Sequence, residues 1–174
     1  LTSVNRLTVR VADTFDPDRP RGKQESHVYK RGGIWYQTIS GPVRSIWIEP
    51  IERNRLRSRL GVVSSIEDRM VEFRLTTRIY DPGLYHLRIV VSAPGVEQPL
   101  AVKNVELPLD AGEQRQYLAL ELPNAQLWST STPMLYQAIV QLQSPTGYIS
   151  QIGVHFGLRH IEARGKWIYL NGER

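Results

Sequence analysis

Apolar residues alternate with polar ones along most of this chain, and this period of two limits its fold more than any other feature. The alternation is clear in residues 71–75, 87–91, 118–122, 140–142 and 152–158. Successive side chains of a strand point to opposite faces, so each segment is predicted to be a half-buried strand with one face on a core. No stretch shows a sustained helical period with caps, and the predicted fold class is all-β.

Turn signals separate these predicted strands. They are the tripeptides Asp81-Pro82-Gly83, Ala93-Pro94-Gly95, Asp110-Ala111-Gly112 and Pro145-Thr146-Gly147. About seven short strands with regularly spaced turns indicate an immunoglobulin-like β-sandwich over residues 51–163. The chain has no cysteine, so the disulfide-centred core of antibody domains is absent and the likeness concerns architecture only.

The first fifty residues have a different pattern. Residues 7–11 alternate like a strand, residues 13–24 form a polar loop, and β character resumes at 35–39 and 43–48. Two or three strands cannot close a core alone. We therefore interpret residues 1–50 as the C-terminal part of another β domain, with a boundary near Glu49-Pro50.

The C-terminal segment predicts a second kind of boundary. Two short strands flank Arg164-Gly165, and the second of them runs into Asn171-Gly172. Asn-Gly is a strong hairpin signal because both residues tolerate positive φ. A hairpin turn is normally followed by a strand, whereas only Glu173 and Arg174 follow here, so we expect the segment to belong to a longer protein.

Composition excludes several classes of site. Of the 174 residues, 41% are hydrophobic, which is enough for a core, and no apolar run reaches the length of a membrane span. The lack of cysteine excludes disulfides, thiolate nucleophiles and cysteine-based zinc sites. A cysteine-free chain is compatible with either the bacterial cytoplasm or the periplasm, so the localisation stays unknown.

The chain carries a net charge of +5, which raises the possibility of a polyanionic partner. Part of the charge lies in an alternating stripe of four arginines, Arg53, Arg55, Arg57 and Arg59. Alternation places them on one face, opposite Leu56 and Leu60. No aromatic residue interleaves the stripe, which favours a solvated face or an interdomain contact over nucleic-acid binding.

Three segments are more specific than a β pattern requires. They are DRPRGKQ at 18–24 followed by WYQTISGPVRSIWIEP at 35–50, LWSTSTPMLY at 127–136, and FGLRHIEARGKWIYLNG at 156–172. Taken in this order, they resemble the family 2 glycoside hydrolases, the β-galactosidase-like enzymes, and the resemblance spans the whole chain. It implies the end of a sugar-binding jelly roll at 1–50, an immunoglobulin-like sandwich at 51–163, and a lead-in to a catalytic (β/α)8 barrel at 164–174.

The resemblance also implies where the chemistry lies. The family is a retaining one, with an acid/base glutamate and a nucleophilic glutamate in the barrel, about 5–5.5 Å apart. No position here matches either motif, so we expect no catalytic residue in this segment. Loop carboxylates such as Asp13 and Glu67 are expected to cap turns or face water. His155 and His160 have opposite strand parity, so no metal site is expected, and no cofactor is implied.

The loop around DRPRGKQ is the best candidate for contact with a sugar. Arg21, Lys23 and Gln24 could donate hydrogen bonds to hydroxyl groups, and Trp35 or Tyr36 could stack on a sugar face. The alternative, which we favour, is that Arg21 and Lys23 tie the jelly roll to its neighbours.

One residue of the second motif and one of the third are assigned structural roles. Trp128 is interpreted as a plug for one end of the sandwich rather than a platform for a sugar. Arg159 is expected to pair with a carboxylate at the junction with the barrel.

The leading functional hypothesis is a non-catalytic supporting segment of a retaining β-glycosidase. The partners would be a β-glycoside or oligosaccharide, bound through the longer enzyme, and the jelly roll and barrel of that chain, with no nucleic acid or membrane. The alternative is a stand-alone carbohydrate-binding β-sandwich. The sugar specificity and the oligomeric state stay open.

Overall fold

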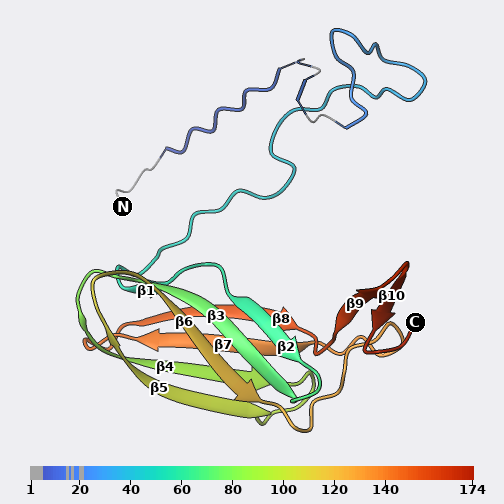
Figure 1. The fold of residues 1–174 in the computed structure, drawn as a ribbon. Coiled ribbons are helices and arrows are strands. Elements are labelled where there is room, and N and C mark those ends of the chain that lie inside the picture. Colours follow the sequence, from blue (N-terminus) through green and yellow to red (C-terminus); the bar gives the residue numbers. More distant parts are fainter. Residues whose placement is uncertain (1–5, 15, 17, 20–21) are drawn as a thin grey trace. The chain divides into compact units, whose positions relative to one another are not determined.

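The computed structural model describes residues 6–14, 16, 18–19 and 22–174, and these contain strands but no helix. The chain divides into two compact units, Leu1–Glu49 and Pro50–Arg174, each of which is described by itself (Figure 1). The all-β prediction is confirmed. The second unit holds all ten strands of the described chain.

The first sheet of the second unit is built around one long central strand. This strand, β3 (Met70–Ile79), pairs antiparallel along one edge with β6 (Gly112–Glu121). Two shorter strands, β1 (Arg55–Leu56) and β2 (Gly61–Ser65), follow one another along its other edge. β1 and β2 therefore act as one interrupted edge strand.

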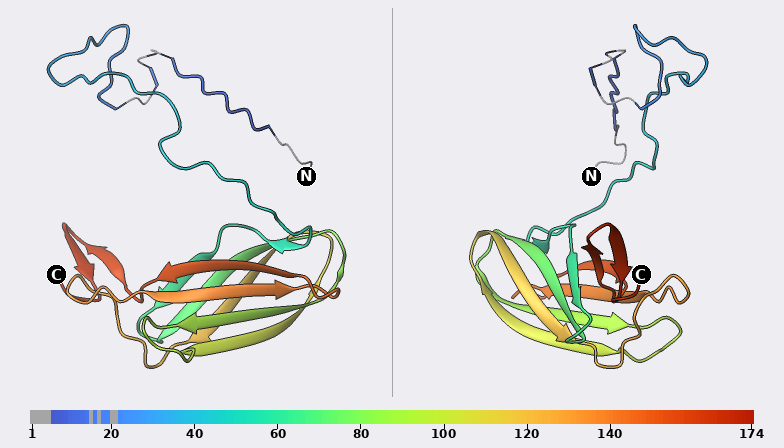
Figure 2. Two further views of the ribbon diagram at one scale, coloured as in Figure 1. Left: turned by 180° about the vertical axis from the view of Figure 1, so that it is seen from behind. Right: turned by 45° about the vertical axis from the view of Figure 1, so that its right-hand side comes forward.

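The second sheet has four strands in the order β5-β4-β7-β8, and all its pairings are antiparallel. Its members are β4 (Gly83–Ser92), β5 (Ala101–Leu109), β7 (Tyr136–Gln143) and β8 (Ile149–Phe156). Figure 2 shows the two sheets as facing layers. With β1 and β2 counted as one position, the sandwich has the predicted seven strands, and the predicted sandwich architecture is confirmed.

The core lies between the two sheets and comes from every second residue of the long strands. It includes Val71, Phe73 and Leu75 of β3, Leu87, Ile89 and Val91 of β4, and Ala138, Val140 and Leu142 of β7, all with exposed fractions of 2% or less. The alternation in the sequence therefore identified the inward-facing positions. The two rings of Phe73 and Phe156 meet edge to face, with centroids 5.8 Å apart.

A buried tyrosine fixes the connection between the sheets. Tyr136 begins β7 and is 2% exposed, and its hydroxyl accepts a hydrogen bond from the Gln126 backbone N–H at 2.7 Å. The same hydroxyl donates to the Gln126 carbonyl at 3.3 Å. The arrangement is that of a tyrosine corner, which ties a crossing loop back to the strand that follows it.

The first unit does not form the strands predicted at 7–11, 35–39 and 43–48. Among its described residues there are only two isolated bridges, Gln24 with Tyr36 and Gly32 with Trp35. A strand needs a continuous neighbour to satisfy its backbone groups, whereas residues 35–39 have only isolated bridges and no described residue pairs with 7–11 or 43–48. The prediction of strands here is wrong for the described residues. The assignment of 1–50 to a jelly roll stays a prediction.

The C-terminal segment forms a small hairpin of its own. Strands β9 (Ile161–Arg164) and β10 (Trp167–Leu170) pair antiparallel around Gly165, which has a φ of 61°. The predicted Asn171-Gly172 turn also forms, with φ of 53° and 86° at its two residues. It closes reciprocal backbone hydrogen bonds between Leu170 and Glu173. The expected start of the lead-in, at 164, falls within β9.

Candidate functional site

Residues 22–39 of the first unit contain the predicted sugar-contacting loop. Backbone bonds close it: Tyr36 N–H donates to the Lys23 carbonyl at 2.7 Å, and Glu25 N–H donates to the Tyr36 carbonyl at 2.8 Å. These bonds place Lys23 and Gln24 beside Trp35 and Tyr36, so the structure brings three of the four candidate residues together. The fourth, Arg21, lies outside the described residues.

Two of the candidates are engaged within the loop itself. The ring of Trp35 stacks on Tyr29, with centroids 4.2 Å apart and an interplanar angle of 18°, so one face of the indole is covered. The side-chain oxygen of Gln24 accepts a hydrogen bond from Ile39 N–H at 3.2 Å. Lys23 is exposed, and so is Tyr36, whose exposed fraction is 63%. Their contact with a sugar stays a prediction.

Sequence reasoning missed the residues that hold the loop in shape. The Ser26 side chain is buried, and its hydroxyl oxygen accepts hydrogen bonds from the backbone N–H groups of Val28 and Tyr29. This serine turn sets the position of the Tyr29 ring against Trp35. The one signal in the sequence was a serine three residues before an aromatic residue, which is typical of a serine turn. It did not identify Trp35 as the ring on which Tyr29 stacks.

The junction between the sandwich and the C-terminal hairpin is held by Asn171. Its side-chain amide donates to the Trp128 carbonyl at 2.9 Å, and its side-chain oxygen accepts from His160 N–H at 2.9 Å. Its own N–H donates to the His160 carbonyl at 2.8 Å. The residue that forms the turn therefore also fixes the hairpin to the loop that carries Trp128.

Trp128 lies half-buried at this junction and packs tightly on Gly157. A Cβ atom added at Gly157 would lie 2.8 Å from the Cβ of Trp128. The guanidinium of Arg159 lies over the indole ring, 4.7 Å from its centroid, which is a cation–π contact. A carboxylate partner for Arg159 at the junction with a barrel stays a prediction.

The electrostatics of the hairpin do not favour acid catalysis. The Arg164 side chain donates a hydrogen bond to Glu162, and this bond is the main reason why the pKa of Glu162 is lowered. A general acid needs a raised pKa, so the direction is the opposite of the one required. Among the described residues, no group of three histidine or carboxylate side chains is placed to bind a metal ion. None of the described segments is a helix long and apolar enough to cross a membrane.

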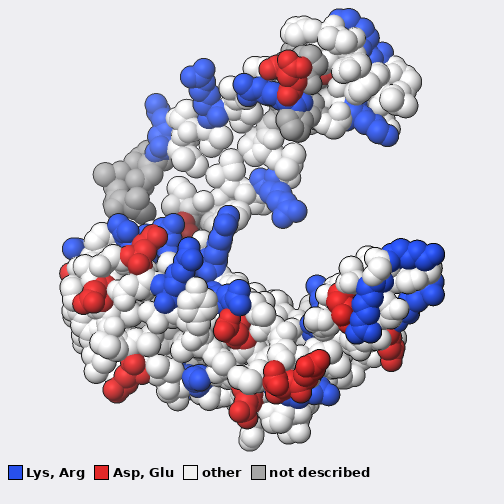
Figure 3. Space-filling view, in the orientation of Figure 1, with Lys and Arg blue, Asp and Glu red and all other residues white. Residues whose placement is uncertain are grey.

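The arginine stripe lies on the outer face of the first sheet, where basic side chains gather over β1, β3 and β6 (Figure 3). Local carboxylates offset part of this charge: Arg53 lies 3.7 Å from Asp81, and Arg57 lies 3.6 Å from Glu113. Arg59, by contrast, lines a shallow hollow with two further arginines, Arg74 and Arg115. Leu56 is buried on the opposite face, in agreement with the predicted alternation.

The sequence model of Glycosyl hydrolases family 2 matches residues 43–159, which span the whole sandwich from β1 to β8. The sequence has no match among the curated proteins.

Solved structures of family members share the fold. A family 2 glycosyl hydrolase from Bacteroides cellulosilyticus superposes with a TM-score of 0.65 at 21% identity, over 71% of this chain and 17% of that one. A Bacteroides fragilis protein provisionally described as a beta-galactosidase gives 0.61 at 18% identity, over 71% and 20%. The Bacteroides uniformis beta-glucuronidase gives 0.56 at 16% identity, over 71% and 16%.

This chain thus spans a fifth or less of each of these proteins. At such identities the likeness shows the fold alone, while the family match covers more than half of the chain and includes the whole sandwich. The chain belongs to glycosyl hydrolase family 2.

Proposed function

We propose that this chain is a non-catalytic supporting segment of a retaining, β-galactosidase-like β-glycosidase. Residues 1–50 would complete a sugar-binding jelly roll, and residues 164–174 would lead into a catalytic barrel. The sandwich would hold these two domains in a fixed relative position and help to shape the rim of the active site. The β-glycoside would bind to the longer enzyme.

The position of the family match carries the proposal. Residues 43–159 coincide with a sandwich whose inner face is filled by aliphatic and aromatic side chains. Among the described residues, the hydrogen bond from Arg164 lowers the pKa of Glu162. The general acid of a glycoside hydrolase needs a raised pKa, so the direction at Glu162 supports a non-catalytic role for the C-terminal hairpin.

Hydrolysis of nitrophenyl β-galactoside tests the proposal. The 174-residue chain alone should give no turnover above a mock purification, and the chain extended by its barrel should hydrolyse at least one nitrophenyl β-glycoside. A panel of galactoside, glucuronide and mannoside substrates would define the sugar. Turnover by the isolated segment that survives repeated purification would refute the supporting role.

A second candidate function is carbohydrate binding by the loop at residues 22–39. The exposed Tyr36 ring and the neighbouring Lys23 ammonium favour it, because they form an aromatic surface next to a hydrogen-bond donor. Calorimetry with galactosides and plant polysaccharides would test it. Tyr36→Ala should then abolish the heat, while Tyr117→Ala, at a similarly exposed tyrosine on β6, should not. The absence of heat at millimolar ligand would count against the binding function.

A further inference from the structure

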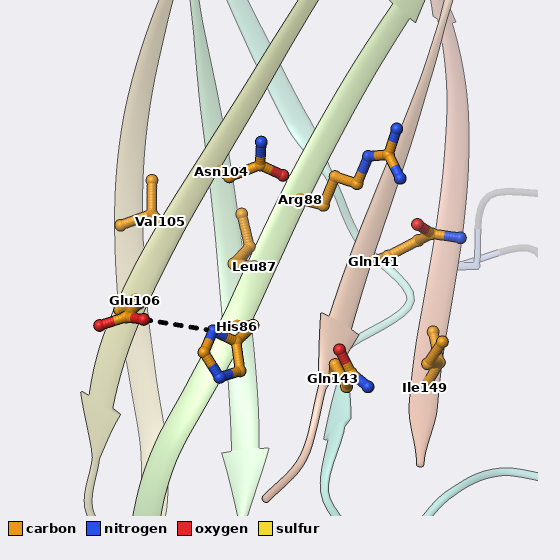
Figure 4. A pocket seen from close by; sticks show the side chains of 9 residues that line it. All are labelled: His86, Leu87, Arg88, Asn104, Val105, Glu106, Gln141, Gln143 and Ile149. Carbon is orange, nitrogen blue, oxygen red and sulfur yellow. Dashed lines mark ion pairs between the residues drawn. The ribbon is translucent and has the colours of Figure 1, made fainter. Parts of the chain in front are cut away.

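The outer face of the four-stranded sheet carries a hollow that neither the loop nor the junction includes. It has a volume of about 480 Å³ and receives side chains from all four strands of that sheet (Figure 4). Such a volume is in the range of small-molecule sites, which are typically about 300–1,000 Å³. The hollow is open to solvent along the sheet, so it fits an extended ligand better than an enclosed one.

Strand register places the polar side chains of the hollow in two adjacent rows. In the first row Arg88 of β4 stands between Asn104 of β5 and Gln141 of β7. In the second row, two residues along each strand, His86 stands between Glu106 and Gln143. Residues two apart on a strand share a face, so both rows point outward together. Figure 4 shows these side chains spread over the same stretch of the sheet.

Most hydrogen-bonding groups in these rows remain available. Gln141 donates its side-chain amide to Gln151 at 2.8 Å, which leaves the Gln141 oxygen as an acceptor. Asn104, Gln143 and Arg88 are exposed, and their side chains make no hydrogen bond or ion pair with the described residues. A side-chain amide offers both donors and an acceptor, and a guanidinium offers five donors. Together these groups match the paired hydroxyl groups of a sugar.

The hollow holds charged groups of both signs. Arg88 contributes one positive charge and Glu106 one negative charge, and the Glu106 carboxylate also lies 3.7 Å from the His86 ring nitrogen. The Glu106 carboxylate offsets the Arg88 guanidinium, so the lining lacks the excess of arginines found in the stripe on the other sheet. Ile149, which is 52% exposed, adds an apolar edge against which the C–H face of a sugar ring can pack.

We propose that this hollow is an accessory binding site for a neutral oligosaccharide that lies across β5, β4, β7 and β8. The four strands span about 15 Å, from a spacing of about 4.8 Å between neighbours, so the ligand would be several rings long. The proposal rests on the carbohydrate function proposed above for its class of ligand. The site would hold a polymeric substrate near the enzyme without taking part in hydrolysis.

Nuclear magnetic resonance of the wild-type chain gives a first test that needs no variant. Titration with linear neutral hexasaccharides of β-linked glucose, mannose and galactose should shift the side-chain amide signals of Asn104, Gln141 and Gln143 with at least one of them. The amide signal of Gln137, on the same strand outside the hollow, should not move. If none of the three sugars shifts these signals at millimolar concentration, the proposal is wrong.

Matched variants give the second test, by calorimetry with the sugar that binds. Arg88→Ala and Gln143→Ala should each weaken binding about tenfold, whereas Arg115→Ala and Gln137→Ala should change it less than twofold. Equal losses in all four variants would overturn the site. Preferential binding of polygalacturonate with a steep salt dependence would also overturn it, because it would indicate binding at the arginine stripe. Self-association of the chain through this face would overturn it as well.

The two proposals fail separately. An inactive barrel-extended chain would refute the glycosidase assignment and leave the sugar titration unaffected. An absent titration in an active barrel-extended enzyme would refute only the accessory site.

Discussion

The two units of this chain carry the same kind of sequence pattern and reach different structures. Leu7, Val9 and Val11 alternate as regularly as Leu87, Ile89 and Val91, yet the first three are 50% or more exposed and the last three are 1% or less exposed. The difference lies in the neighbours. β4 pairs with β5 over residues 83–91 and with β7 over residues 86–92, whereas no described residue pairs with 7–11. A period of two marks the capacity to form a half-buried strand, and the strand forms only where partners supply hydrogen bonds and a facing layer.

The largest effect is expected in the centre of the sandwich. Phe73→Ala should lower the free energy of unfolding by about 3–5 kcal/mol, because it removes a fully buried ring that packs on Phe156. Val9→Ala should change it by less than about 0.5 kcal/mol. Urea unfolding followed by tryptophan fluorescence would measure both. Similar losses at the two positions would mean that the first unit is packed as densely as the second.

Dense packing should extend to the end of the sandwich. Gly157→Ala should cost about 2 kcal/mol, since the new Cβ would lie 2.8 Å from the Cβ of Trp128 and one of the two must shift. Gly153→Ala, four residues earlier on β8, is the control, because a Cβ added there would lie at an ordinary 3.7 Å from the Ala138 carbonyl oxygen. Thermal denaturation would compare them. Equal stability of the two variants would show that Trp128 moves freely.

The tyrosine corner should give a smaller effect. Tyr136→Phe should cost about 1 kcal/mol, because the Gln126 N–H and carbonyl lose their hydrogen bonds to the hydroxyl while the ring stays in place. Tyr36→Phe, in the first unit, should leave the unfolding of the sandwich unchanged. The measurement is again urea unfolding. If Tyr136→Phe left the free energy of unfolding unchanged, water would be replacing the hydroxyl without loss of stability.

The smallest effect is expected at the exposed C-terminal hairpin. The hydrogen bond from Arg164 lowers the pKa of Glu162 in the folded chain, so this pair stabilises the fold fully above the unfolded value of 4.5. The contribution is lost as the pH falls through the lower, folded value. Melting temperatures between about pH 3 and pH 6 should show this small loss, and Glu162→Gln should remove it. A contribution that grows as the pH falls would contradict the assigned direction.

Most of the sandwich could be predicted from the sequence, and the reason is visible in single residues. Phe73, Ile89 and Val140 stand at alternating positions within strands bounded by Gly and Pro turns, and such local patterns determine which face is buried. The Asn171-Gly172 turn was predictable for the same reason, since positive φ is a property of the residues themselves. The candidate loop was predictable only in part: Lys23, Gln24 and Trp35 do lie together, but Tyr29 and Ser26 were not identified.

The contacts that define the possible sites depend on residues far apart in the chain. The Trp128–Asn171 bond joins positions 43 residues apart, and the hollow beside Arg88 needs side chains from four strands in one register. The sequence by itself determined the alternation, the turns and therefore the inward face of each strand, because these depend on backbone geometry and neighbouring side chains. Only the tertiary structure decided which strands paired, since pairing needs a partner whose hydrogen bonds and apolar surface come from elsewhere in the chain.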